Sequence, residues 1–181
     1  MKNFRPSFVI KTALVLTAIA ATSALLIGGA DLLTKDIIET NAKEKEKQVL
    51  QRYFGIVVGN EDGYVIENDP VLKKYFTVKL SNEELCYVYR AEGKNGFGNL
   101  SLLAGIKESG VFYNLHVLEN GQSYGAVLQE KYLDPIEQGD NKDEALNQVK
   151  CGATKGATLA LKLVNAAKDH FNKYIKEGQH E

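Results

Sequence analysis

The segment from Cys151 to Thr158 reads Cys-Gly-Ala-Thr-Lys-Gly-Ala-Thr and places two threonine hydroxyls among small residues. Apolar residues then recur with the i, i+3, i+4, i+7 spacing of an amphipathic helix, at Ala160, Leu163, Val164, Ala167, Phe171 and Ile175. Small residues at the start of a helix leave its first backbone N–H groups accessible, at the positive end of the helix dipole. This arrangement suits a phosphate. A simpler interpretation stays open, in which Thr154 or Thr158 caps the helix.

An uncharged run from Thr12 to Ala30 precedes the rest of the chain. A helix of this length spans roughly 28 Å, which is enough to cross the hydrocarbon core of a bilayer. Lys2, Arg5 and Lys11 stand before the run. By the positive-inside rule, the N-terminus is expected in the cytoplasm and the remainder of the chain outside it.

A cleaved signal peptide is the competing interpretation, with Ala21-Thr22-Ser23 as its cleavage site. The apolar run continues beyond that site through Ala24-Leu25-Leu26-Ile27, which the short core of a signal peptide would not do. The sequence therefore favours an uncleaved, single-pass anchor.

The pattern predicts three parts. Residues 1–34 are expected to form a cytoplasmic tip and transmembrane anchor, residues 35–54 a helical stalk of alternating charge, and residues 55–181 one extracytoplasmic domain of ordinary size. The formal net charge of −1, without a basic stripe, argues against a nucleic-acid partner.

Cysteine and histidine supply little further chemistry. Cys86 and Cys151 are the two cysteines, and outside the cytoplasm they could form a disulfide or remain separate thiols. His116, His170 and His180 stand far apart without metal-ligand spacing, so no metal site is expected.

Residues 55–134 carry the signals of strands and turns. Runs typical of strands are found at 75–80, 86–89 and 111–118, which are rich in β-branched and aromatic residues, and at 100–106, which is mostly apolar. We expect two to four antiparallel strands from them, followed by a polar loop or short helix over 137–147 and the C-terminal amphipathic helix. The predicted fold class is therefore α+β.

The order of these features resembles the G subunit of the Rnf electron-transport complex. The resemblance rests on the anchor followed by Leu33–Lys43, on the hairpin containing Gly96-Phe97-Gly98 and ending at Val117-Leu118-Glu119, and on Gly152-Ala153-Thr154. The hairpin is similar to the FMN-binding domain shared with the C subunit of the sodium-translocating NADH:quinone reductase. The likeness covers nearly the whole chain.

The resemblance implies a covalently bound FMN. In this family a threonine hydroxyl is esterified to the FMN phosphate by a separate flavin transferase, which uses FAD and magnesium. The corresponding residue here is Thr154, flanked by Gly152 and Ala153, and Thr158 is the alternative attachment site. Cys151 stands where the family has Ser or Thr, and the family segment Glu-Thr-Pro-Gly-Leu-Gly corresponds here to 121–125, without its proline.

The implied function is electron transfer in an ion-translocating oxidoreductase that includes other Rnf-type membrane subunits. FMN would supply the redox chemistry, so no catalytic acid or base is expected of this chain. Phe97, Tyr113 and Tyr124 are the candidates to stack on the flavin ring, and for each of them plain packing in the core is the alternative. Two alternatives remain: a stand-alone extracytoplasmic flavoprotein, and a flavin-free tethered binding or assembly module.

Overall fold

The computed structural model describes residues 6–176, without the side chains of residues 6–10, 12, 26–28, 30–39 and 42. The chain divides into two compact units, Met1–Glu46 and Lys47–Glu181. The boundary falls inside a single helix, α1 (Pro6–Tyr53), which contains both the expected anchor and the expected stalk. The last turns of α1 therefore belong to the second unit.

Of the expectations for the N-terminal part of the chain, the structure confirms that the expected anchor and stalk are helical. Residues 12–30 and 35–53 are helical and continuous with one another, so the anchor and stalk are one element rather than two. No helix in the described part of the chain combines the length and apolar character needed to cross a membrane. Lys2 and Arg5, of the expected cytoplasmic tip, lie outside the described residues.

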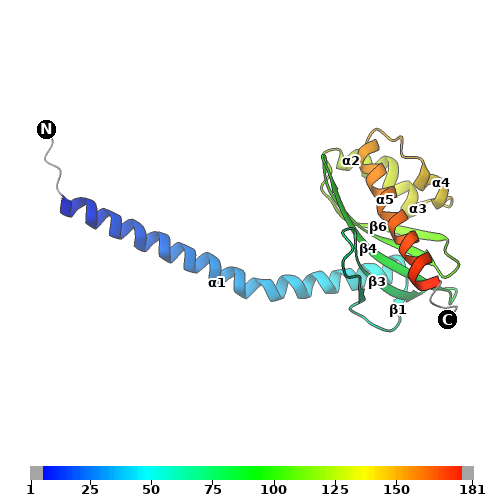
Figure 1. The fold of residues 1–181 in the computed structure, drawn as a ribbon, viewed down its shortest axis with the longest axis horizontal. Helices are drawn as coiled ribbons and strands as arrows, with labels where there is room; N and C mark the ends of the chain where they lie inside the picture. Colours follow the sequence, from blue (N-terminus) through cyan, green and yellow to red (C-terminus); the bar gives the residue numbers. More distant parts are fainter. Residues whose placement is uncertain (1–5, 177–181) are drawn as a thin grey trace. The chain divides into compact units, whose positions relative to one another are not determined.

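The second unit is built on an antiparallel sheet with the strand order β1-β3-β4-β5-β6, to which β2 adds by pairing with β3 (Figure 1). The long strands are β3 (Leu72–Lys79), β4 (Leu85–Asn95), β5 (Gly98–Lys107) and β6 (Phe112–Asn120). The edge strands β1 (Ile56–Val57) and β2 (Tyr64–Val65) are much shorter. The four predicted runs are confirmed as β3 to β6, whereas the expected total of two to four strands was too low by the two short edge strands.

Both faces of the sheet are covered near its middle. Helix α5 (Thr154–His170) packs along one face, and its buried side chains include Leu163 and Val164 (Figure 1). Leu50 and Phe54, at the end of α1 and just after it, pack on the opposite face against Leu103. Because β5 is enclosed from both sides, its residues are buried without alternation from Leu100 to Ile106.

Short helical segments connect β6 to α5. They are α2 (Gly125–Leu128), the π-helix η1 (Gln129–Leu133), α3 (Asp134–Gln138) and α4 (Lys142–Asn147). α4 fulfils the expectation of a short helix within 137–147. After α5 the chain continues as a π-helix, η2 (Phe171–Lys176). The apolar positions predicted for the C-terminal helix are buried from Ala160 to Phe171, and Ile175 packs against the same core, so its amphipathic character is confirmed.

Candidate functional site

A cavity of about 210 Å³ lies at the start of α5, and we refer to it as the Thr154 cavity. Three segments distant in sequence form its wall: the tip of the β4–β5 hairpin, the loop between β6 and α2, and the first turn of α5 with the residues before it. The lining residues are Phe97, Gln122, Tyr124, Gly152, Ala153, Thr154, Lys155 and Gly156.

The hairpin tip is tied directly to α5. The Asn95 side-chain amide donates a hydrogen bond to the Lys155 carbonyl at 3.1 Å, and the Phe97 N–H donates to Asn95 Oδ1 at 2.8 Å. Gly98 has φ +137, and a Cβ there would lie 2.0 Å from the Gly121 carbonyl oxygen. Glycine is therefore required where the hairpin meets the β6–α2 loop.

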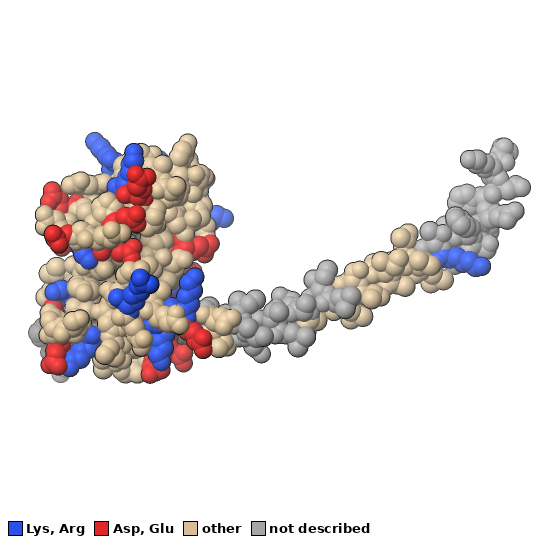
Figure 2. Space-filling model, turned by 180° about the vertical axis from the view of Figure 1, so that it is seen from behind, with Lys and Arg blue, Asp and Glu red and all other residues tan. Residues whose placement is uncertain are grey.

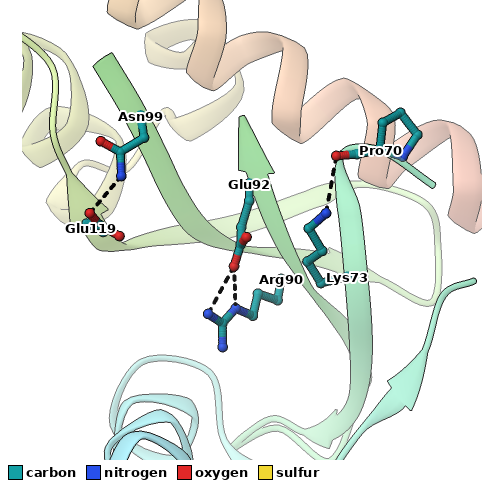
Figure 3. Close-up of polar contacts among 6 residues, drawn as sticks. All are labelled: Pro70, Lys73, Arg90, Glu92, Asn99 and Glu119. Carbon is teal, nitrogen blue, oxygen red and sulfur yellow. Dashed lines mark hydrogen bonds and ion pairs between the residues drawn. The ribbon is translucent and has the colours of Figure 1, made fainter. Parts of the chain in front are cut away.

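The β6–α2 loop is held against the same hairpin. The N–H and hydroxyl of Ser123 both donate to the Phe97 carbonyl, at 2.8 and 2.9 Å. The Asn99 carbonyl accepts the Gly121 N–H at 3.0 Å, and its side-chain amide donates to Glu119 Oε1 at 2.7 Å (Figure 3). These bonds fix the position of Phe97 relative to the loop that carries Gln122.

The first turn of α5 presents accessible hydrogen-bond donors. Ala153 is the N-cap residue and offers no side-chain cap, while its carbonyl accepts the N–H groups of Gly156 and Ala157. Among the described residues, the N–H groups of Thr154 and Lys155 have no backbone acceptor. Such donors, at the positive end of a helix dipole, form a site suited to an anion.

The two candidate threonines lie in different surroundings. Thr154 lines the cavity and is exposed, and its hydroxyl makes no hydrogen bond within the part of the chain that the structure describes. The Thr158 hydroxyl instead donates back to the Thr154 carbonyl at 2.7 Å. Neither hydroxyl caps α5, so the simple capping interpretation does not hold. Gly152, before the helix, has φ +86 and lines the same cavity.

The aromatic candidates separate clearly. Phe97 and Tyr124 line the Thr154 cavity and are 43% and 62% exposed. Tyr113 does not line it. Its ring lies 6.4 Å from that of Phe54, on the sheet face that α1 covers, with the Lys107 ammonium 5.7 Å from its centroid.

The cavity is suited electrostatically to a negatively charged, partly aromatic ligand. Its lining contains one cation, Lys155, and no carboxylate among the described residues. On the face of this unit that is drawn in Figure 2, basic and acidic side chains are interspersed. That face carries no continuous basic stripe of the kind that nucleic-acid binding uses.

The remaining chemical candidates do not line this cavity. Cys86 and Cys151 are both free thiols, and burial raises the pKa of Cys86 to about 12. His116 stacks on Tyr53 at 4.0 Å between ring centroids, and His170 lies 3.3 Å from the Tyr89 hydroxyl. Within the described residues, no group of three or more His, Cys, Asp or Glu side chains is placed to hold a metal.

Two side chains that line the cavity, those of Lys155 and Gln122, were missed as functional candidates in the sequence. Lys155 directly follows Thr154 and is the second residue of α5. Its position next to the predicted helix start could therefore have indicated a lysine that binds an anion. Gln122 gives no such signal, because its burial depends on the meeting of the hairpin, the loop and α5.

Comparison with known proteins bears on the N-terminal part of the chain. Residues 1–52 match the family model of the RnfG N-terminal region. No curated protein matches the chain. The Thr154 cavity lies outside the matched residues. For residues 1–52 the resemblance to the G subunit of the Rnf complex is confirmed, and the match supports an RnfG-type subunit.

Proposed function

We propose that this chain is an electron-transfer subunit of an Rnf-type ion-translocating oxidoreductase, carrying FMN as a phosphoester on Thr154. The observation that carries the proposal is the Thr154 cavity itself. It combines a free threonine hydroxyl, two backbone N–H groups without backbone acceptors and two exposed aromatic rings. The match of residues 1–52 to RnfG independently favours the same family of complexes.

The lining residues fit the parts of FMN. The ester oxygen would be that of Thr154, and the phosphate would accept hydrogen bonds from the N–H groups of Thr154 and Lys155 at the positive end of α5. Phe97 and Tyr124 offer ring faces for the isoalloxazine. When bound, FMN supplies the redox chemistry, and the protein positions and tunes it.

Attachment requires a separate flavin transferase with FAD and magnesium. The threonine hydroxyl forms a new O–P bond to the FMN phosphorus of FAD, the pyrophosphate P–O bond breaks, and AMP leaves while the hydroxyl proton is released. Thr154 is favoured over Thr158 because the Thr158 hydroxyl is engaged with the Thr154 carbonyl at 2.7 Å. The exposure of Thr154 also gives a transferase access to its oxygen.

The size of the cavity agrees with a flavin that exchanges electrons with a partner. At about 210 Å³ it is smaller than the roughly 300–1,000 Å³ of pockets that enclose whole ligands. Part of the bound FMN would therefore remain at the surface, within reach of a redox partner. That partner would be another membrane subunit of the complex.

The membrane placement in this proposal rests on the sequence of the N-terminal segment. The uncharged run Thr12–Ala30, preceded by Lys2, Arg5 and Lys11, favours a single-pass anchor with the main domain outside the cytoplasm. The RnfG match over residues 1–52 covers this run and is consistent with association with a membrane complex.

Flavin fluorescence of the denatured protein tests the proposal. The full chain is expressed with a flavin transferase that is active on a known target, and compared with Thr154→Ala and Thr158→Ala. We expect fluorescence on the protein band of the parent and of Thr158→Ala, and none on Thr154→Ala. If the parent protein shows no fluorescence, the proposal of covalent FMN is refuted. A tethered binding or assembly module is then the function that remains. Loss of fluorescence in Thr158→Ala alone would place the attachment on Thr158, one helical turn after Thr154.

A further inference from the structure

Gln122 is a buried side chain in the wall of the Thr154 cavity whose hydrogen-bonding capacity is mostly unused. It is 8% exposed. Its Nε2 donates one long hydrogen bond, 3.4 Å, to the Asn99 carbonyl. Among the described residues, Oε1 accepts no hydrogen bond and the second N–H of the carboxamide has no acceptor. The carboxamide is not sealed from the cavity, so its free acceptor and donor stay open to hydrogen bonds from a ligand.

The backbone of Gln122, which carries this carboxamide, is fixed by two hydrogen bonds. The Gln122 N–H donates to Asn120 Oδ1 at 3.3 Å, and its carbonyl accepts the Gly125 N–H at 2.8 Å. Its Oε1 lies close to the first turn of α5, since a Cβ built on Gly156 would be 3.4 Å from that oxygen. A side chain held in this way needs little reorganisation to bind a ligand.

A carboxamide with one free acceptor and one free donor matches a specific kind of ligand edge. The pyrimidine edge of an oxidised isoalloxazine carries an N–H between two carbonyl groups, and Phe97 and Tyr124 offer only ring faces and a phenol nearby. Resting on the function proposed above, we propose that Gln122 hydrogen-bonds this pyrimidine edge. Oε1 accepts the ring N–H, and Nε2 donates to an adjacent ring carbonyl.

This pairing sets the reduction potential of the flavin. Reduction places more negative charge on the pyrimidine carbonyl groups, and a donor to one of them stabilises the reduced ring. Removing the donor should shift the oxidised-to-reduced equilibrium about tenfold toward the oxidised form, which for a two-electron couple lowers the midpoint potential by about 30 mV.

The test is a redox titration of the flavin-loaded full chain in detergent, followed by visible absorption. Gln122→Leu removes the donor and acceptor. Gln122→Glu keeps the shape, loses the donor above the pKa of the carboxyl group and adds a negative charge. Gln148→Leu is the matched control, because Gln148 is exposed and lies outside the Thr154 cavity. We expect both Gln122 variants to titrate at lower potential than the parent, and Gln148→Leu to titrate with it.

Flavin content, measured by fluorescence after denaturation, separates the two proposals. Equal flavin content with unshifted potentials in the Gln122 variants would overturn the role of Gln122 and leave the FMN assignment intact. A parent without flavin would overturn both. If Gln122→Leu does not fold, the isosteric Gln122→Glu decides the question alone, and a potential equal to the parent's refutes the inference.

Discussion

Replacing Gly156 by alanine should destabilise the protein, because the first turn of α5 is packed tightly against α2. A Cβ at Gly156 would lie 2.7 Å from Cδ2 and 3.3 Å from Cδ1 of Leu128, which is fully buried. Such overpacking costs about 1–3 kcal/mol, while alanine in place of glycine in a helix gains about 1 kcal/mol. We therefore expect Gly156→Ala to lower the free energy of unfolding by about 1 kcal/mol.

The same change should become stabilising once the clashing atoms are removed. Leu128→Val has no Cδ atoms, so in that background Gly156→Ala should gain about 1 kcal/mol from helix propensity. The sign change corresponds to a coupling free energy of about 2 kcal/mol between the two positions. Gly96→Ala is the control, because a Cβ there meets nothing within 4 Å.

Urea unfolding of the full chain in detergent measures both free energies. The chain contains nine tyrosines and no tryptophan, so near-UV circular dichroism of tyrosine reports on core packing. If Gly156→Ala stabilises the protein equally in both backgrounds, α5 does not approach Leu128 as described. The wall of the Thr154 cavity would then be looser than the contacts of Gly156 indicate.

Three further predictions concern single groups. Burial lowers the pKa of His170, so below about pH 6.5 the unfolded state binds a proton that the folded state binds less readily. The free energy of unfolding should therefore fall as the pH drops below about 6.5, and His170→Gln should flatten that dependence in unfolding experiments. At pH 8 iodoacetamide should label the half-buried Cys151 much faster than Cys86, whose pKa is raised to about 12 by burial, and equal labelling by mass spectrometry would contradict this. Tyr124→Ala should raise the native-state fluorescence of attached flavin severalfold toward that of the denatured protein, because a tyrosine beside the ring quenches it by electron transfer. Phe97→Ala removes no such electron donor and is the matched control; unchanged fluorescence in Tyr124→Ala would place the ring elsewhere.

The C-terminal helix and the long strands could be predicted because their signals are local. Leu163, Val164 and Ala167 repeat with the helical period, and they lie on the buried face of α5. The runs that became β3, β4 and β6 are rich in β-branched and aromatic residues, and the run that became β5 is mostly apolar between turn signals. β1 and β2 have two residues each and exist only by pairing with β3, so no local pattern identifies them.

The candidate site was predictable in its centre and not in its wall. Gly152-Ala153-Thr154 marks the helix start in the sequence itself, and the structure places it in the cavity. The choice among Phe97, Tyr113 and Tyr124 depended on tertiary structure, because Phe97 lies at the hairpin tip and Tyr124 in the β6–α2 loop, whereas Tyr113 lies in the sheet. The register shift between β5 and β6 at Gly105/Ile106 falls where Tyr113 lies, with its ring on the α1 side of the sheet, and such a bulge cannot be read from alternation alone.

Peptide mass spectrometry of the chain expressed with a flavin transferase tests the attachment at Thr154 most directly. Trypsin cleaves after Lys150, Lys155 and Lys162, so the two candidate threonines fall on different peptides, 151–155 and 156–162. We predict the FMN mass on 151–155, or on the joined peptide 151–162 with fragmentation that assigns it to Thr154. FMN on 156–162, or both peptides unmodified beside a fully flavinylated control target, would contradict the assignment.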